Sequence, residues 1–295
     1  MKFWVRFSRI ICKLAVSPWL KKAQAKSLES VLQKSIGLLE PEMLGEMQSF
    51  IRLKQTKEGG FADRAGRCDL YYSLFGYFVA ETLSMPDSKG PMKGYIKKAV
   101  TENTLTGVHL YCGAILYAKL WGLNDIAETI RKQVVAQLQK ANQQQSEYTN
   151  FLGILALYYL EDFIGMKRLV NQYKSAGFSK EMPCPVTAAT TILLEISGKP
   201  DPMAEEKLKS FYRGKGGFVA LKQAPAEDLL STAVALYALN FIDADIRLLK
   251  PDCITFIDDL YLSGGFRSMQ VDVETDVEYT FYGLLALGAL TIGSE

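Results

Sequence analysis

The sequence predicts an all-α protein, an (α/α)6 toroid built from about six helical-hairpin repeats, and three observations favour this fold. Apolar residues recur at helical spacing through the long segments, whereas the alternation typical of strands is nearly absent. Six of these segments are similar to one another and recur at a fairly regular spacing. Between them lie more charged, amphipathic segments such as 124–141 and 202–213, which suit an outer layer of helices.

The six apolar segments are the expected inner helices, and their starts are 38 to 48 residues apart. They begin at Asp69, Gly107, Ser146, Pro185, Asp228 and Asp276. Seven residues into five of them stands a small residue: Gly76, Ala114, Gly153, Ala235 and Gly283. Because glycine costs a helix about 1 kcal/mol relative to alanine, we interpret this column as a place where neighbouring inner helices approach closely. Close approach favours a closed ring, and an open superhelix, as in tetratricopeptide or armadillo arrays, is the alternative.

Residues 1–28 form a separate basic segment with seven lysine and arginine residues and no acidic residue. Apolar and basic side chains fall on different faces of a helical wheel, so we expect an amphipathic helix. One interpretation is a helix on the inner face of an anionic membrane, which it contacts through Phe3, Trp4, Phe7, Arg6 and Arg9. The other is that this helix packs its apolar stripe on the toroid domain of residues 29–295.

Composition excludes several classes of protein. The 295 residues are 48% hydrophobic and 22% charged, which is typical of a globular protein. The net charge of +2 predicts no nucleic-acid partner. The five cysteines are scattered and form no Cys-x-x-Cys pair, so we expect reduced thiols in a cytoplasmic protein. A single histidine, His109, excludes a histidine-rich metal centre.

Four carboxylates are candidate catalytic groups: Asp69, Asp228, Asp276 and Glu278. They stand at the starts of predicted inner helices, which we expect to meet on one rim of the ring, where a carboxyl group can act as acid or base. An aspartate at a helix start is equally explained as an N-cap that accepts hydrogen bonds from backbone N–H groups. Both interpretations stay open for the three aspartates.

His109 and Cys112 lie three residues apart on one predicted helix face, where Cys68 or Cys184 from across the rim would complete a zinc site. This spacing is not diagnostic, because a cysteine on an apolar helix usually acts as a small hydrophobic residue. The alternating acids of residues 272–278 are a second set that can hold Mg²⁺. Neither set forms a full motif, so we expect no metal and no other cofactor.

Aromatic residues gather in the first turns of the predicted inner helices, where a cavity would open. Such walls suit an apolar chain or, through cation–π contact, an allylic cation, although aromatic stripes are more often plain core. The predicted ligand contacts are Tyr71, Tyr72, Phe75, Tyr111, Tyr148 and Tyr279. Arg67 and Arg267 flank glycine turns and are candidates to bind phosphate or headgroup oxygens.

Three Gly-Gly-Phe turns, at 59–61, 216–218 and 264–266, each lead within ten residues to the aspartate that begins a predicted inner helix. In these stretches the chain resembles the prenyltransferase and squalene-cyclase repeat family, with a glycine turn, a polar loop, an aspartate and an apolar helix. The resemblance covers residues 48–293. It implies an α/α toroid, similar to a protein prenyltransferase β subunit or a terpenoid cyclase, whose cavity holds an isoprenoid chain.

The catalytic motifs of that family do not carry over. Family β subunits place a zinc-binding histidine three residues after the repeat aspartate, and this chain has Tyr72 and Tyr279 there. Its Asp-x-Cys element is missing, as are the Asp-x-Asp-Asp acid motif of the cyclases and the Asp-Asp-x-x-Asp diphosphate motif. The resemblance therefore implies the scaffold of the family without its standard chemistry.

The sequence leaves two functions open. The first is an isoprenoid- or lipid-handling protein at a membrane surface, either a prenyltransferase-like or cyclase-like enzyme or a binding protein. The alternative is a non-catalytic partner subunit or scaffold, because family β subunits pair with a helical α subunit. A carbohydrate-active (α/α)6 enzyme is disfavoured, since sugar sites are normally rich in tryptophan and this chain has three tryptophans.

Overall fold

The computed structural model describes residues 22–102, 104–140, 147–175, 182–214 and 216–291, and they form an all-α fold, as predicted. The helices are α3 (Leu28–Ser35), α4 (Pro41–Lys54), α5 (Leu70–Thr82), α6 (Lys89–Thr101), α7 (Gly107–Trp121), α8 (Asp125–Lys140), α9 (Glu147–Tyr159), α10 (Phe163–Ser175), α11 (Cys184–Ile196), α12 (Ala204–Lys209), α13 (Leu229–Phe241), α14 (Lys250–Asp258) and α15 (Val277–Leu290). Two short antiparallel sheets join some of them, β1 (Phe61–Ala62) with β2 (Cys68–Asp69) and β3 (Tyr261–Leu262) with β4 (Gly265–Phe266). The predicted membrane contacts, Phe3, Trp4, Arg6, Phe7 and Arg9, lie outside the described residues.

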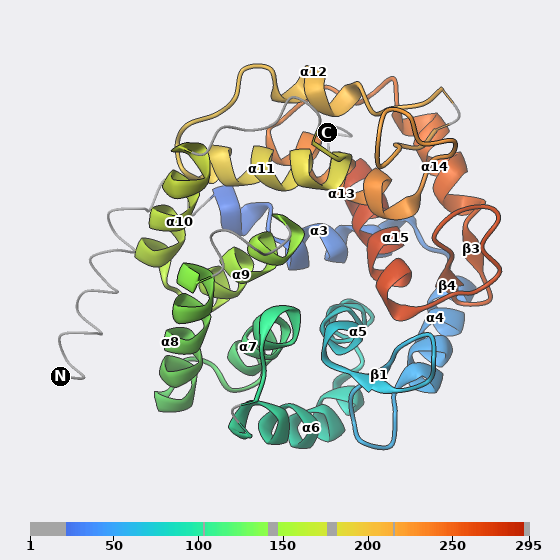
Figure 1. The fold of residues 1–295 in the computed structure, drawn as a ribbon. Coiled ribbons are helices and arrows are strands. Elements are labelled where there is room, and N and C mark those ends of the chain that lie inside the picture. The colour runs from blue at the N-terminus through green and yellow to red at the C-terminus, as the bar shows by residue number, and fades with distance from the viewer. Residues whose placement is uncertain (1–21, 103, 141–146, 176–181, 215, 292–295) are drawn as a thin grey trace.

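The helices form two layers that follow from the two kinds of segment in the sequence. Figure 1 shows α5, α7, α9, α11, α13 and α15 on the inside and α4, α6, α8, α10, α12 and α14 at the periphery. The inner helices begin within one residue of their predicted starts. α15 is buried along nearly its whole length, because its residues from Phe281 onward are apolar on every side. α8 buries only Ala127, Ile130, Val134 and Leu138, which lie on one face.

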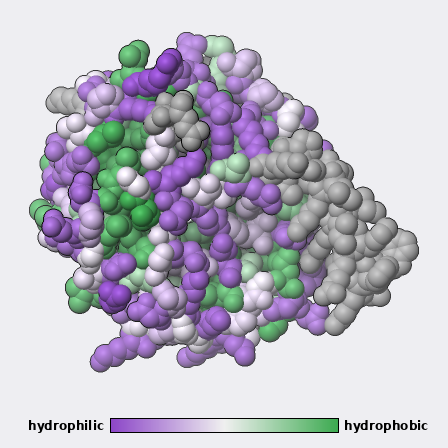
Figure 2. Space-filling model, turned by 180° about the vertical axis from the view of Figure 1, so that it is seen from behind, coloured by the Kyte–Doolittle hydropathy of each residue, from purple (hydrophilic) through white to green (hydrophobic). Residues whose placement is uncertain are grey.

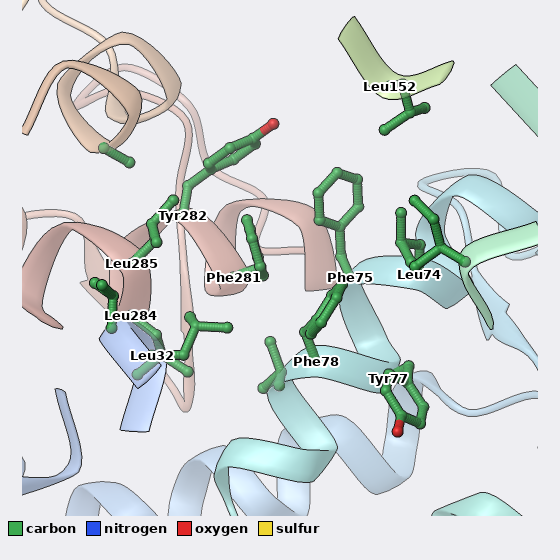
Figure 3. Packing of buried hydrophobic residues seen from close by; sticks show 14 of the residues in the cluster. Leu32, Leu74, Phe75, Tyr77, Phe78, Leu152, Phe281, Tyr282, Leu284 and Leu285 are labelled. Atoms are coloured by element: carbon green, nitrogen blue, oxygen red, sulfur yellow. The ribbon is translucent and has the colours of Figure 1, made fainter. Parts of the chain in front are cut away.

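The inner helices contact one another in chain order, and the last contacts the first. α5 packs against α7, α7 against α9, α9 against α11, α11 against α13 and α13 against α15. α15 then packs against α5. At this last contact the ring centroid of Phe75 lies 5.0 Å from that of Phe281 and 5.6 Å from that of Tyr282. The labelled side chains of these residues lie together between the two helices in Figure 3.

The segment of residues 22–35 covers one end of the inner helices. α3 packs against α15 and α5, and a Cβ atom added to Gly288 of α15 would lie only 1.9 Å from the carbonyl oxygen of Val31. The Lys26 ammonium group donates to the carbonyl oxygens of Asn240 and Phe241, at 2.8 and 3.1 Å. These two carbonyls lie in the last turn of α13, where helices leave carbonyl groups without partners.

The three Gly-Gly-Phe turns fold in the same way. Phe61 pairs with Asp69, Phe218 with Asp228 and Phe266 with Asp276 in antiparallel backbone bridges. A hydroxyl group four residues after each aspartate accepts a hydrogen bond from the phenylalanine N–H. The acceptors are Ser73, Thr232 and Thr280, at 2.8, 2.9 and 3.3 Å. Each turn is therefore tied to the first turn of the inner helix that follows it.

Two glycines in the column of small residues, Gly76 and Gly283, are small for a different reason from the one expected. A Cβ atom added to Gly76 would lie 2.3 Å from the ring of Phe61, and one added to Gly283 would lie 2.5 Å from the ring of Phe266. These glycines are therefore small because the phenylalanine of the preceding turn packs on them, not because another inner helix approaches. Gly153 fits the expectation in part, since its neighbours are Leu138 of the outer helix α8 and Tyr111 of the inner helix α7.

The Gly-Gly-Phe turn at 264–266 also brings a late part of the chain against an early one. Gly264 has a φ of 85°, which glycine adopts readily, and an added Cβ would lie 2.5 Å from the carbonyl oxygen of Glu46 in α4. Nearby, the Tyr261 hydroxyl donates to the Glu46 carboxylate at 2.7 Å. The turn at Gly59 docks in the same way on Pro91 of α6, the next outer helix along the chain. The last repeat thus packs on the first outer helix.

The face opposite to that of Figure 1 carries an area of apolar side chains surrounded by polar ones (Figure 2). Among the described residues, no helix combines the length and the apolar character that a membrane crossing requires.

Candidate functional site

A cavity of about 190 Å³ lies among the inner helices. α5, α9, α11, α13 and α15 supply most of its wall, and the chain around the start of α3 adds Ala23, Ser27 and Leu28. Phe75, Phe281 and Tyr282 form its aromatic side. Among the described residues that line it, none carries a charged side chain. The cavity therefore offers an apolar surface with a few neutral polar groups.

The half-buried part of the cavity lining includes side chains of α9, α11 and α13. Its lining side chains on the first two of these helices include Phe151 and Leu155 of α9 and Val186 and Ala189 of α11, and these four are only half-buried. The lining side chains from α5 and α15, such as Leu74 and Leu285, are fully buried. The more exposed side of the cavity is therefore formed by α9, α11 and α13, and the more buried side by α5 and α15.

A chain of hydrogen bonds leads from this cavity to the carboxyl group of Glu278. Tyr148 lines the cavity, and its hydroxyl lies 2.8 Å from that of Tyr71. The Tyr71 hydroxyl donates to Oε1 of Glu278 at 2.6 Å. A phenol has one proton, so while Tyr71 donates to Glu278 it accepts from Tyr148. The three groups form a path along which a proton can move between the carboxyl and the cavity wall.

Burial makes Glu278 an unusual carboxyl group. Its side chain is 8% exposed, and this desolvation raises its pKa to about 7. The hydrogen bond from Tyr71 opposes the rise, while the negative charges of Asp276 and Asp69 add to it. A carboxyl group with a pKa near 7 exchanges a proton at neutral pH, which is what a general acid or base requires.

Beside Glu278, Arg64 holds two further carboxylates. Its Nε donates to Asp276 at 2.6 Å and a terminal nitrogen donates to Asp272 at 2.9 Å. Burial alone would raise the pKa of Asp272, but hydrogen bonds from Ser268 and Arg64 outweigh this and lower it. The guanidinium also lies over the ring of Tyr279, 5.5 Å from its centroid. This arginine is thus a structural counter-ion in the loops that precede α5 and α15.

The three predicted catalytic aspartates are helix N-caps in the structure. The Asp69 carboxylate accepts from the N–H groups of Tyr71 and Tyr72, that of Asp228 from Ser231, and that of Asp276 from Tyr279. Of the two interpretations made from the sequence, the structure supports the cap for each aspartate. Burial raises the pKa of Asp228, although the hydrogen bond from Ser231 opposes this.

The candidate zinc pair does not assemble a metal site. Nε2 of His109 lies 3.0 Å from Oδ2 of Asp69 at the rim. Cys112 is fully buried, and desolvation first, then the charges of Asp69 and Glu278, raises the pKa of its thiol well above the ordinary value. Within the described part of the chain, no group of three or more His, Cys, Asp or Glu side chains could hold a metal ion.

Of the predicted ligand contacts, Phe75 and Tyr148 line the cavity and Tyr71 lies one hydrogen bond behind it. Tyr72 lies outside the lining, and burial, followed by the charges of Asp276 and Glu278, raises its pKa to about 12. Tyr111 is fully buried and does not reach the cavity, because its ring packs 3.0 Å from the Cβ position of Gly153.

The two predicted phosphate-binding arginines and Tyr279 also lie away from the cavity lining. Arg67 is 80% exposed and pairs with Asp63 at 2.8 Å. Arg267 donates to the carbonyl oxygens of Gln270 and Asp272, at 3.3 and 3.4 Å, and so holds its own loop together. The expected opening at the Asp69 and Asp276 rim is likewise not part of the lining.

Asn150 is one of the polar cavity residues that were not predicted from the sequence. Asn150 is 7% exposed and lines the cavity, and its Oδ1 has no hydrogen-bond partner among the described residues. An asparagine within the apolar segment 146–160 could have indicated this position from the sequence, because a buried polar side chain normally needs a hydrogen-bond partner.

Comparison with known proteins gives no relative. No model of a known protein family matches the chain, and no curated protein matches it significantly. The cavity and the Glu278 network are therefore the basis on which a function can be proposed.

Proposed function

We propose that this chain is an α/α toroid that binds an isoprenoid or other lipid chain in its central cavity. The observation that carries this proposal is a cavity of about 190 Å³ with aromatic and aliphatic walls and no charge among its described lining residues. Burial of apolar surface stabilises a complex by roughly 25 cal/mol per Å², so such a wall favours an apolar guest.

The toroid itself is part of the proposal. It is supported by the cyclic order of contacts among α5, α7, α9, α11, α13 and α15. It is supported also by the packing of Gly264 and Tyr261 of the last repeat on Glu46 of α4. Six helical hairpins arranged in this order would surround a centre, and the cavity lies where that centre would be.

The size of the cavity limits the guest. A core cavity of about 150 Å³ binds benzene, whereas sites for drug-sized ligands run from about 300 to 1,000 Å³. A volume of about 190 Å³ therefore suits a short apolar chain, or one end of a longer chain that leaves at the more exposed side formed by α9, α11 and α13.

The N-cap roles of the three aspartates favour lipid binding over the catalytic chemistry of the prenyltransferase and squalene-cyclase repeat family. Asp69, Asp228 and Asp276 each use a carboxylate oxygen to cap a helix, which explains their presence without a catalytic role. Glu278 is the predicted acid that is not a cap, and it reaches the cavity through Tyr71 and Tyr148. If the bound chain reacts, Glu278 is the group through which acid catalysis would operate.

The same N-cap roles support the alternative, a non-catalytic partner subunit or scaffold. A scaffold would present its outer helices to another helical protein and would leave the cavity empty. Measurement of the mass of the full chain by light scattering, as purified from the cells that produce it naturally, distinguishes the two. A stoichiometric protein partner and no extractable lipid would favour the scaffold.

The test of lipid binding is solvent extraction of the purified full chain followed by mass spectrometry. We expect an apolar compound in the extract of the wild type and a strongly reduced amount from Ala189→Phe, in which the new ring takes up cavity space beside α11. Ala65→Phe, at an exposed position, is the matched control and should retain the compound. Equal extracts from the wild type and both variants would contradict the proposal.

A further inference from the structure

We infer that the ligand of this cavity is a neutral alcohol, an apolar chain that ends in one hydroxyl group, and that Asn150 binds this hydroxyl. The inference rests on the proposed function, because it specifies the ligand class of the same cavity. It goes further in that it excludes the charged diphosphates and carboxylates that an apolar chain can also carry.

The first observation in favour of an alcohol is the buried side chain of Asn150. Its side chain is more than nine-tenths buried and lines the cavity, yet its Oδ1 has no hydrogen-bond partner among the described residues. A buried carbonyl oxygen without a partner loses the hydrogen bonds that it made to water in the unfolded chain. A donor on the ligand would restore one of them. The amide presents an oxygen and a nitrogen side by side, and a hydroxyl group can donate to the first or accept from the second.

Three tyrosines that line the cavity have other hydrogen-bond partners, the first being Tyr282, which is hydrogen-bonded to Tyr148. Tyr148, two residues before Asn150 on α9, also lines the cavity, and its hydroxyl is 2.8 Å from that of Tyr71. Because Tyr71 donates its own proton to Glu278, the Tyr148 hydroxyl donates its proton to Tyr71 and cannot also donate it to Asn150. Tyr237 of α13, which also lines the cavity, donates its hydroxyl proton to the carbonyl of Lys26 at 2.7 Å. The hydrogen bond to Asn150 is thus left for the ligand.

The second observation in favour of an alcohol is the lack of charged side chains in the described cavity lining. The described lining contains no lysine, arginine or histidine that could pair with an anionic headgroup. Two lysines lie behind lining rings, Lys22 over Phe241 at 6.0 Å and Lys119 over Tyr159 at 5.7 Å. Both are already paired with carboxylates, Lys22 with Glu195 and Lys119 with Glu29, so neither is free to pair with a ligand. An anion moved from water into this site would lose its hydration and gain no cation, which is strongly unfavourable. A hydroxyl group carries no such cost.

The experiment is sealed equilibrium dialysis of the full chain against three probes with the same ten-carbon skeleton. These are geraniol, geranyl diphosphate and 2,6-dimethylocta-2,6-diene, the hydrocarbon that lacks the hydroxyl group of geraniol. Each is measured with the wild type, with Asn150→Leu, and with Leu53→Met as a control at an exposed position outside the cavity. Circular dichroism establishes that each variant is folded.

We expect geraniol to bind the wild type about tenfold more tightly than the hydrocarbon, as one buried hydrogen bond predicts. Asn150→Leu should remove this preference and leave hydrocarbon binding unchanged, while Leu53→Met should keep the preference. Geranyl diphosphate should bind more weakly than geraniol.

Two outcomes overturn the inference and leave the proposed function standing: hydrocarbon and alcohol binding equally well to the wild type, or the diphosphate binding more tightly than the alcohol. Binding of none of the three probes would instead contradict the proposed function itself. If Asn150→Leu does not fold, the comparison of the three probes on the wild type still decides the question.

Discussion

The Tyr71 hydroxyl donates a 2.6 Å hydrogen bond to the carboxyl group of Glu278, and these residues lie 207 positions apart in the sequence. Tyr71 is in the first turn of α5 and Glu278 in the first turn of α15. The bond therefore crosses the contact between the first and the last inner helix. It places a carboxyl group with a pKa of about 7 at that contact, one tyrosine away from the cavity wall.

Glu278 should make the stability of the protein depend on pH. Its pKa is about 7 in the folded protein and 4.5 for the unperturbed group, so folding favours the protonated form. Between these two pH values the folded state binds more protons than the unfolded state, and stability falls as pH rises. Relative to Glu278→Gln, the wild type should lose about 3 kcal/mol of unfolding free energy from pH 4.5 to pH 8. Urea denaturation at each pH measures this.

Glu274→Gln is the matched control for that experiment, because Glu274 is exposed in the preceding loop. Its unfolding free energy should follow that of the wild type across the same range. Parallel curves for the wild type and Glu278→Gln would show that Glu278 is not desolvated as described.

Gly76→Ala should destabilise the protein even though alanine favours helices. The added methyl group would meet the ring of Phe61, which is 2.3 Å from the Cβ position. Overpacking of this kind costs about 1–3 kcal/mol. Gly94→Ala, at an exposed position in α6 with no atom within 4 Å of the Cβ position, should instead stabilise by up to about 1 kcal/mol. Thermal unfolding measures whether each variant is more or less stable than the wild type. A Gly76→Ala variant that is more stable would contradict the packing of Phe61 on Gly76.

Gly288→Ala should release α3 from α15. The added Cβ would lie 1.9 Å from the backbone carbonyl oxygen of Val31, and a backbone atom cannot move aside without shifting its helix. Hydrogen exchange of the amides in residues 28–35 should become at least about tenfold faster, as an opening free energy lowered by about 1.4 kcal/mol predicts. Gly45→Ala, with open space at its Cβ position in α4, should leave their exchange unchanged.

Asp228 is expected to matter as a cap rather than as an acid. Asp228→Asn keeps a side-chain oxygen that can accept from the Ser231 N–H, which Asp228 binds at 2.7 Å. It should retain nearly full stability, whereas Asp228→Ala should lose about 1 kcal/mol. Chemical denaturation distinguishes the two. Equal losses in both variants would mean that the charge, and not the cap, is what the position requires.

Much of this architecture could be predicted from the sequence because it depends on local chemistry. The inner helices are apolar on every side, which marks them as buried, and their starts are marked by aspartates that cap them. The Gly-Gly-Phe turns identify the repeat. Each of these signals is contained in a few neighbouring residues, and each agrees with the structure at α5, α13 and α15.

The rest depends on contacts between distant parts of the chain. A helix that is apolar on every side does not reveal which side faces a cavity, so Tyr111 was expected at the ligand and is instead packed against α9. Gly76 was assigned to a contact between helices because the fold of the turn that places Phe61 on it was not foreseen. The contribution of residues 23–28 to the cavity wall could not be seen for the same reason.

The most direct test of this account is the dissociation constant of 2,6-dimethylocta-2,6-diene for the wild type, Ala189→Phe and Ala65→Phe. An apolar cavity that binds a chain predicts saturable binding at one site per wild-type molecule. It predicts at least about tenfold weaker binding to Ala189→Phe, where about 1.4 kcal/mol or more of apolar contact is replaced by the new ring, and unchanged binding to Ala65→Phe. Absence of saturable binding to the wild type, or equal binding to all three proteins, would contradict it.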